Sequence, residues 1–134
     1  MIRQEFPDGT EIADWYVRAV RAGPFVFVAG TTSLDPKGKV RGRDAGAQTR
    51  VTMRKIDQAL KRAGSSMEEV TRLTIYCIDM RDGGAIAAEI ARWFKKARCA
   101  SALIGVSALA VSGLLVEIEA TAVAIDNPAK ATKR

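Results

Sequence analysis

Hydrophobic and polar residues follow regular spacings along most of this chain, and those spacings predict its secondary structure. Alternating or β-branched stretches predict strands over residues 1–6, 15–21, 25–29, 70–79, 102–109 and 114–125. Apolar residues three and four positions apart predict a helix over 47–63 and a second helix with the stripe Ile86, Ile90, Trp93, Phe94 and Ala97. The predicted order is β-β-β-α-β-α-β-β.

Glycine and proline mark the connections between these elements. Gly23-Pro24 indicates a hairpin between the second and third strands, and Gly64 ends the first helix. Residues 30–46 are rich in Gly, Ser, Thr and Asp, which predicts a long irregular loop of a kind that is often functional. The loop contains neither GxGxxG nor GxxxxGKS/T, so it is not a phosphate-binding loop.

The order of strands and helices predicts the fold class. Strands that precede and bracket two helices favour an α+β fold, with a mixed six-stranded sheet and both helices packed on one face. Residues 25–28 are apolar on both faces, so this strand is predicted to lie inside the sheet. The other face of the sheet needs a cover, and self-association is the simplest one. We expect residues 1–126 to form a single domain and residues 127–134 a disordered basic tail.

The composition excludes several kinds of active site. The chain has no histidine, so it cannot form a Ser-His-Asp triad, a Cys-His pair or an HExxH zinc site. Proton transfer must then use a carboxylate, tyrosine, cysteine, lysine or bound water. Cys77 and Cys99 lie in no metal-ligand spacing, and we expect both to be small buried thiols. No metal site is predicted.

The charge and hydropathy patterns bear on partners and location. The net charge is +6, but Lys130, Lys133 and Arg134 lie beyond the last acidic residue, and the other basic residues are scattered. Proteins that bind single-stranded nucleic acid combine basic and aromatic residues, and no such patch is visible here. We therefore do not expect nucleic-acid binding. No apolar stretch is long enough to span a membrane and no secretory signal is visible, so a cytoplasmic location is expected.

Several short motifs resemble those of the Rid family, also called YjgF or endoribonuclease L-PSP-like. They are Gly23-Pro24-Phe25-Val26-Phe27-Val28-Ala29-Gly30-Thr31, Gln48-Thr49, Ala63-Gly64-Ser65, Asp79-Met80-Arg81-Asp82 and Val116-Glu117-Ile118-Glu119-Ala120-Thr121-Ala122-Val123. Each motif is weak alone. Together they follow the family's order and spacing over residues 15–125, and this combination of motifs is specific to the family.

The resemblance implies a chorismate-mutase-like homotrimer whose sheets face inward and whose small-molecule clefts lie between subunits. The best-known Rid members are deaminases that hydrolyse reactive enamines and imines without a cofactor. In them an arginine on the penultimate strand binds the substrate carboxylate, and a glutamate on the last strand positions or activates water. Guanidinium is suited to a planar carboxylate, and a site without histidine needs a carboxylate to handle water.

The family's functional positions transfer to this chain only in part. The catalytic glutamate falls on Glu117, the tyrosine lining the cleft on Tyr16, and the glycine after the central strand on Gly30, which is followed by Thr31. The resemblance thus implies that Glu117 is catalytic and that the other three residues bind substrate.

Three positions depart from the family pattern. The arginine position falls on Ser101, the serine beside the glycine becomes Ala29, and an asparagine on the second helix becomes Ala87. This pattern resembles a Rid subgroup without the arginine. In an alternative alignment Arg98 is the family's arginine, with three residues inserted after it. On the preferred register Arg98 lies about 10 Å before Ser101 and on the opposite face of the strand, although its side chain can still reach the rim of the cleft.

Each candidate residue also has a structural explanation. Glu117 can be a solvated or inter-subunit charge, and Tyr16 an aromatic that plugs the hairpin. Arg18 and Arg98 are further candidates for anion binding, or else surface charges. Gly30 can serve backbone geometry alone.

Two functions from different classes remain open. The first is hydrolysis of an enamine, imine or related small acid in an inter-subunit cleft, with Glu117 positioning water. Ser101 argues against the standard 2-iminopropanoate deaminase activity. The second is a non-catalytic homotrimer that binds a small carboxylate-bearing ligand or another protein. RNA cleavage ranks below both, because the chain has no histidine and its charge is diffuse.

Overall fold

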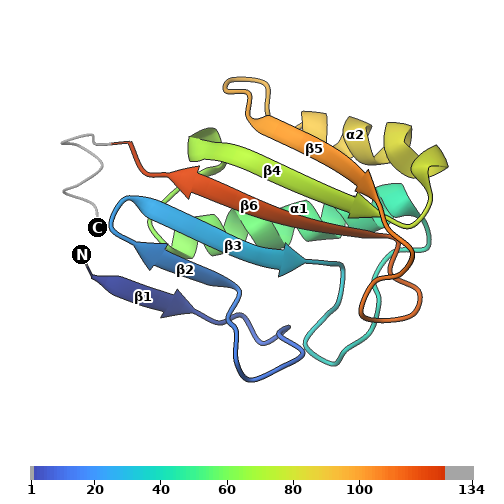
Figure 1. Cartoon of the computed structure of the whole chain (residues 1–134), viewed down its shortest axis with the longest axis horizontal. Coiled ribbons are helices and arrows are strands. Elements are labelled where there is room, and N and C mark those ends of the chain that lie inside the picture. Colours follow the sequence, from blue (N-terminus) through green and yellow to red (C-terminus); the bar gives the residue numbers. More distant parts are fainter. Residues whose placement is uncertain (1, 126–134) are drawn as a thin grey trace.

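Six strands form one mixed sheet in the computed structural model, which describes residues 2–125 (Figure 1). The strands are β1 (Arg3–Phe6), β2 (Ala19–Ala22), β3 (Phe25–Thr31), β4 (Val70–Cys77), β5 (Ala100–Gly105) and β6 (Val116–Val123). The helices are α1 (Ala45–Arg62) and α2 (Gly83–Ala91), with single 3-10 turns η1 (Met67–Glu69) and η2 (Met80–Asp82). The predicted order and the α+β class are confirmed.

The spatial order of the strands is β1-β2-β3-β6-β4-β5. Every neighbouring pair is antiparallel except β4 and β5, which are parallel and are connected through η2 and α2. Parallel neighbours need such a crossover because a tight turn can only reverse the chain. The strand β3 lies inside the sheet, as its apolar sequence predicts.

The helix α1 begins and ends at residues whose chemistry favours a helix boundary. The Asp44 carboxylate accepts a hydrogen bond of 2.8 Å from the backbone N–H of Ala47, which caps the first turn. Gly64 follows the helix with φ +78°, a conformation that favours glycine. Between these ends Met53, Ile56 and Leu60 form a fully buried stripe against the sheet.

The two faces of the sheet have different environments (Figure 1). Both helices lie on one face, where they cover the apolar side chains of the central strands. The opposite face, here called the open face, exposes Phe25 and Phe27 of β3, and Glu119 of β6. The two-sided character predicted for the sheet is therefore present, with two large aromatic residues on the face that no helix covers.

Most elements differ from their predicted boundaries by one or two residues, and the larger differences have local reasons. The strand predicted over 15–21 begins at Ala19, because the N–H of Arg18 is bonded to the Glu11 carboxylate and not to a neighbouring strand. The helix α2 ends at Ala91, whereas the predicted stripe continued to Ala97. Trp93 and Phe94 follow α2 in a turn and still pack against the core.

The strand predicted over 102–109 begins and ends earlier, at Ala100 and Gly105. Its partner β4 ends at Cys77, and the N–H of Val106 makes the last bond to the Cys77 carbonyl. The predicted disordered tail, 127–134, lies outside the described residues. Over residues 2–125, no helix combines the length and the hydropathy needed to cross a bilayer.

Candidate functional site

A β-bulge near the end of β3 places the glycine predicted for the site. Val28 pairs with Ala120 and Thr31 pairs with Ile118, so two residues, Ala29 and Gly30, oppose one residue of β6. A bulge of this kind bends its strand and is common beside active sites. The sequence motif gives no sign of the extra residue, because it reads as an uninterrupted strand.

The Glu117 side chain lies directly against Gly30. A Cβ atom at Gly30 would collide with Glu117 Oε2 and would lie 3.0 Å from Glu117 Cδ. Glycine thus leaves space for the carboxylate, and a larger residue here would displace it. Within residues 2–125 no hydrogen bond or ion pair joins the Glu117 carboxylate to another group, so its oxygens are available to water or a ligand.

The surroundings of Glu117 favour its protonated form. Burial raises the pKa of this half-buried carboxyl above its ordinary value, and the nearby Glu119 carboxylate raises it further. The Arg18 guanidinium opposes both effects. A carboxyl group with a raised pKa is better able to accept and return a proton near neutral pH.

A tyrosine and a second glutamate lie beside Glu117 on the open face. Tyr76, the β4 residue paired with Glu117, donates a hydrogen bond of 2.8 Å to Glu119 Oε1. This bond raises the pKa of the Tyr76 phenol and leaves its proton on oxygen. Glu119 is therefore engaged in a hydrogen bond within the chain, while Glu117 is not.

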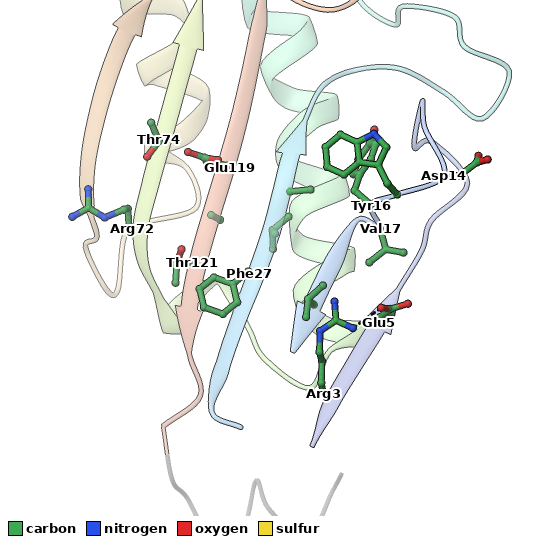
Figure 2. Close-up of a pocket in the computed structure, with 15 residues that line it drawn as sticks. Arg3, Glu5, Asp14, Tyr16, Val17, Phe27, Arg72, Thr74, Glu119 and Thr121 are labelled. Carbon is green, nitrogen blue, oxygen red and sulfur yellow. Dashed lines mark hydrogen bonds and ion pairs between the residues drawn. The ribbon is translucent and has the colours of Figure 1, made fainter. Parts of the chain in front are cut away.

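A hollow of about 500 Å³ lies on the open face, beside this group (Figure 2). Side chains reach it from the segment before β2 and from β3, β4 and β6; those labelled in Figure 2 include Tyr16, Phe27, Arg72, Thr74, Glu119 and Thr121. Ala29 of the bulge also lines it. Its lining combines aromatic and apolar side chains with charged ones, among them Arg3, Glu5, Asp14 and Arg72. Glu117 is not part of this lining and lies beside the hollow.

Tyr16 is held in place by its own hydroxyl. The Tyr16 oxygen accepts a hydrogen bond of 2.9 Å from the backbone N–H of Ile12. Its ring lies 5.2 Å from that of Trp15, which is 85% exposed. Trp15 and Tyr16 together line one side of the hollow.

The remaining predicted residues lie apart from Glu117 within one chain. Arg98 is exposed and precedes β5. Ser101 pairs with Leu73, whose side chain is buried under the helices, so Ser101 projects on the helix side of the sheet. Thr31 is fully buried, and its hydroxyl bonds Ala29 and Arg18. Only its backbone is near the open face.

Arg18 has a position that the sequence analysis did not predict. It was considered as an anion-binding group or a surface charge, but only 2% of it is exposed. Its guanidinium lies beneath the bulge and donates a hydrogen bond of 2.8 Å to the Gly30 carbonyl. A single arginine in an alternating stretch gives no signal of such burial, because its partners come from other segments.

The arrangement of cysteine and acidic side chains within residues 2–125 bears on metal binding. Cys77 is buried, as predicted, and Cys99 is half-buried; both are free thiols. In the part of the chain that the structure describes, no three His, Cys, Asp or Glu side chains are grouped so that they could hold a metal ion.

The fold and the site define a small α+β protein with a carboxylate at a strand bulge and a hollow on an uncovered sheet. The family model for endoribonuclease L-PSP matches residues 9–124, and the chain belongs to this family. The Rid, or YjgF, membership that the motifs imply is confirmed.

Individual relatives agree with this membership. A RutC family protein of Pyrococcus horikoshii is 36% identical over 80% of this chain and 85% of its own length. The 3-aminoacrylate deaminase RutC of Acinetobacter baylyi is 35% identical over the same shares. A crystal structure of a Mycobacterium tuberculosis member of the YjgF/YER057c/UK114 family superposes with a TM-score of 0.83 at 40% identity, covering 91% of this chain and 99% of that one.

Proposed function

We propose that this protein is a homotrimer that binds a small carboxylate-bearing imine or enamine in a cleft between subunits and hydrolyses it. The observation that carries the proposal is the Glu117 carboxylate, half-buried against Gly30 and without a hydrogen-bond partner among residues 2–125. The deaminase name of the Acinetobacter relative supports the same reaction class.

In this reaction an enamine first tautomerises to its imine. Water then adds to the imine carbon, and the Glu117 carboxylate accepts the proton that the water loses. The same proton passes to nitrogen, which completes the carbinolamine. The carbinolamine hydroxyl then gives its proton to the Glu117 carboxylate, which returns it to the amino nitrogen as the C–N bond breaks and the C=O bond forms, so that the products are ammonia and a carbonyl acid. The raised pKa of Glu117 suits both steps, because the group must release the proton as well as accept it.

The substrate carboxylate needs a cation that a single chain does not place beside Glu117. On the preferred alignment Ser101 falls at the family's arginine position, and its side chain faces the helices. We propose that Arg98 of a neighbouring subunit takes this role, since it is exposed and makes no bond within residues 2–125. Guanidinium binds carboxylate through two parallel hydrogen bonds.

Ammonia release from freshly generated 2-iminopropanoate and 3-aminoacrylate tests this function. We expect Glu117→Gln and Arg98→Ala each to lower kcat/KM by about 100-fold, which is the usual effect of losing a general base or a substrate clamp. Glu68→Gln, an equal charge change at an exposed residue, is the control and should leave turnover unchanged. Full activity in Glu117→Gln would contradict the catalytic assignment.

A second function, ligand binding without catalysis, is favoured by one observation. The side chain at the arginine position, Ser101, projects away from the open face. On this alternative the trimer binds a small carboxylic acid saturably, with no ammonia released from any imine supplied. RNA cleavage has less support than either, since positive charge is scattered over the sequence.

A further inference from the structure

The guanidinium of Arg18 connects three separate segments at the base of the site. Nη1 donates to the Gly30 carbonyl at 2.8 Å and to Thr31 Oγ1 at 3.0 Å. Nη2 donates to Thr10 Oγ1 at 3.0 Å, and Nε to Asp8 Oδ2 at 3.1 Å. The fork of N–H groups in arginine has fixed geometry, so these acceptors are held at fixed positions relative to one another.

Gly30 therefore lies between two charged side chains. Arg18 holds its carbonyl oxygen from below, and the Glu117 carboxylate occupies the space where a Cβ would be. A bulge is the part of the strand least restrained by sheet hydrogen bonds, because its extra residue is unpaired. The Arg18 bonds to Gly30 and Thr31 supply the restraint that the strand pairing lacks at this point.

We propose that Arg18 is a positioning residue: it fixes the Ala29–Gly30 bulge and thereby determines where the Glu117 carboxylate lies. This inference rests on the function proposed for Glu117 and adds a residue that acts through the backbone without touching substrate. Arg18 is unsuited to bind substrate directly, because it is buried and its donors are engaged.

The charges around Arg18 favour a geometric role over simple attraction. Asp8 forms a direct ion pair with Arg18 at 3.1 Å, whereas Glu117 lies beyond ion-pair distance. Lys55 lies near the same pair, and burial lowers the pKa of its amine to about 8. On the other side, Glu117 faces Glu119 and Tyr76. Arg18 lowers the Glu117 pKa through its charge, and Arg18→Lys keeps this charge, so that variant isolates the geometric role.

Carbon-13 NMR of the Glu117 carboxyl, assigned with Glu117→Gln, tests the proposal in the intact protein. In Arg18→Lys the positive charge remains but the fork is lost. We expect the carboxylate to gain water, so that its pKa falls by about half a unit or more toward that of an ordinary glutamate. Gly30→Ala, which displaces the carboxylate directly, is the positive reference and should give a shift of the same sign.

Two further variants keep the test decisive. Thr31→Val, of nearly the same shape, removes one Arg18 acceptor together with the bond from the Thr31 hydroxyl to the Ala29 carbonyl. It loosens the same bulge and should produce a smaller shift even if Arg18→Lys fails to fold. Arg21→Lys is the matched control, since Arg21 also donates to backbone carbonyls, at Gly23 and Ala63, far along the sheet from Glu117. An unchanged Glu117 pKa in folded Arg18→Lys or in Thr31→Val would overturn the proposal.

Kinetics separate this inference from the proposed function. If the wild type releases ammonia, Arg18→Lys should lower kcat by about tenfold or more and change KM less than about twofold, because a misplaced general base affects the chemical step. A KM effect alone would contradict a positioning role. If the wild type releases none, the proposed hydrolysis is wrong, and the NMR shifts alone decide whether Arg18 positions Glu117.

Discussion

The surroundings of Glu117 make its charged form unfavourable, which lowers the free energy of unfolding as pH rises. Its pKa in the folded chain is raised, first by burial and then by Glu119, so the folded protein holds this proton more tightly than the unfolded chain. The corresponding stability is fully present below the unfolded pKa of about 4.3 and is lost as pH rises through the folded pKa. Functional groups often carry such costs.

Replacing this carboxyl should therefore stabilise the protein. We expect Glu117→Gln to raise Tm at pH 7, above the unfolded pKa, and to leave Tm nearly unchanged at pH 4, below it. Thermal unfolding followed by circular dichroism at the two pH values measures the effect. Glu68→Gln should show no such dependence. A Glu117→Gln protein that is less stable than wild type at pH 7 would mean that the charge is satisfied by a partner.

At the residue level the sequence names candidates but not all of their surroundings. Glu117 and Gly30 lie in motifs that resemble those of the Rid family, and Tyr16 is assigned from the same resemblance; their roles stay predictions. The role of Arg18 does not, because the fold alone brings Asp8, Thr10 and Gly30 to its guanidinium. The placement of Arg98 and Ser101 relative to Glu117 depends on a second subunit and stays a prediction.

At the scale of elements, α1 depends on its N-terminal cap. Asp44→Ala removes the carboxylate that accepts the Ala47 N–H, and we expect it to cost about 1 kcal/mol in the free energy of unfolding. Urea titration measures the loss, and Asp44→Asn, which can cap equally well, should restore most of it. Equal losses in the two variants would show that the charge of Asp44, and not its capping hydrogen bond, stabilises the helix.

Elements with strong periodicity were predicted well, and those defined by side-chain bonds were not. The stripe Met53, Ile56 and Leu60 identifies α1 within two residues at its start, because burial on one face sets the pattern. The strand at 15–21 was predicted too long, since the bond from Arg18 N–H to Glu11 is invisible to an alternating pattern. The early end of α2 has a similar cause, because Trp93 and Phe94 remain apolar and packed after the helix has ended.

At the scale of the whole molecule, the open face predicts self-association. Phe25 and Phe27 are 40% and 48% exposed on a surface that no helix covers. Phe27→Asp places a charge on this face, and we expect it to convert the proposed homotrimer to a monomer at micromolar concentration. Sedimentation velocity measures the mass. Leu103→Asp, a similar change on the helix side of β5, should leave the assembly intact.

The strand order has a consequence for how the protein is made. Strand β6 follows the other five in the sequence, yet it lies between β3 and β4 in the sheet. A chain emerging from the ribosome up to β5 holds two half-sheets, each with an unpaired edge, and such edges are templates for aggregation. The strand that seals these edges is the one that carries Glu117. During synthesis, the sheet is therefore completed by the same strand that brings Glu117 into place.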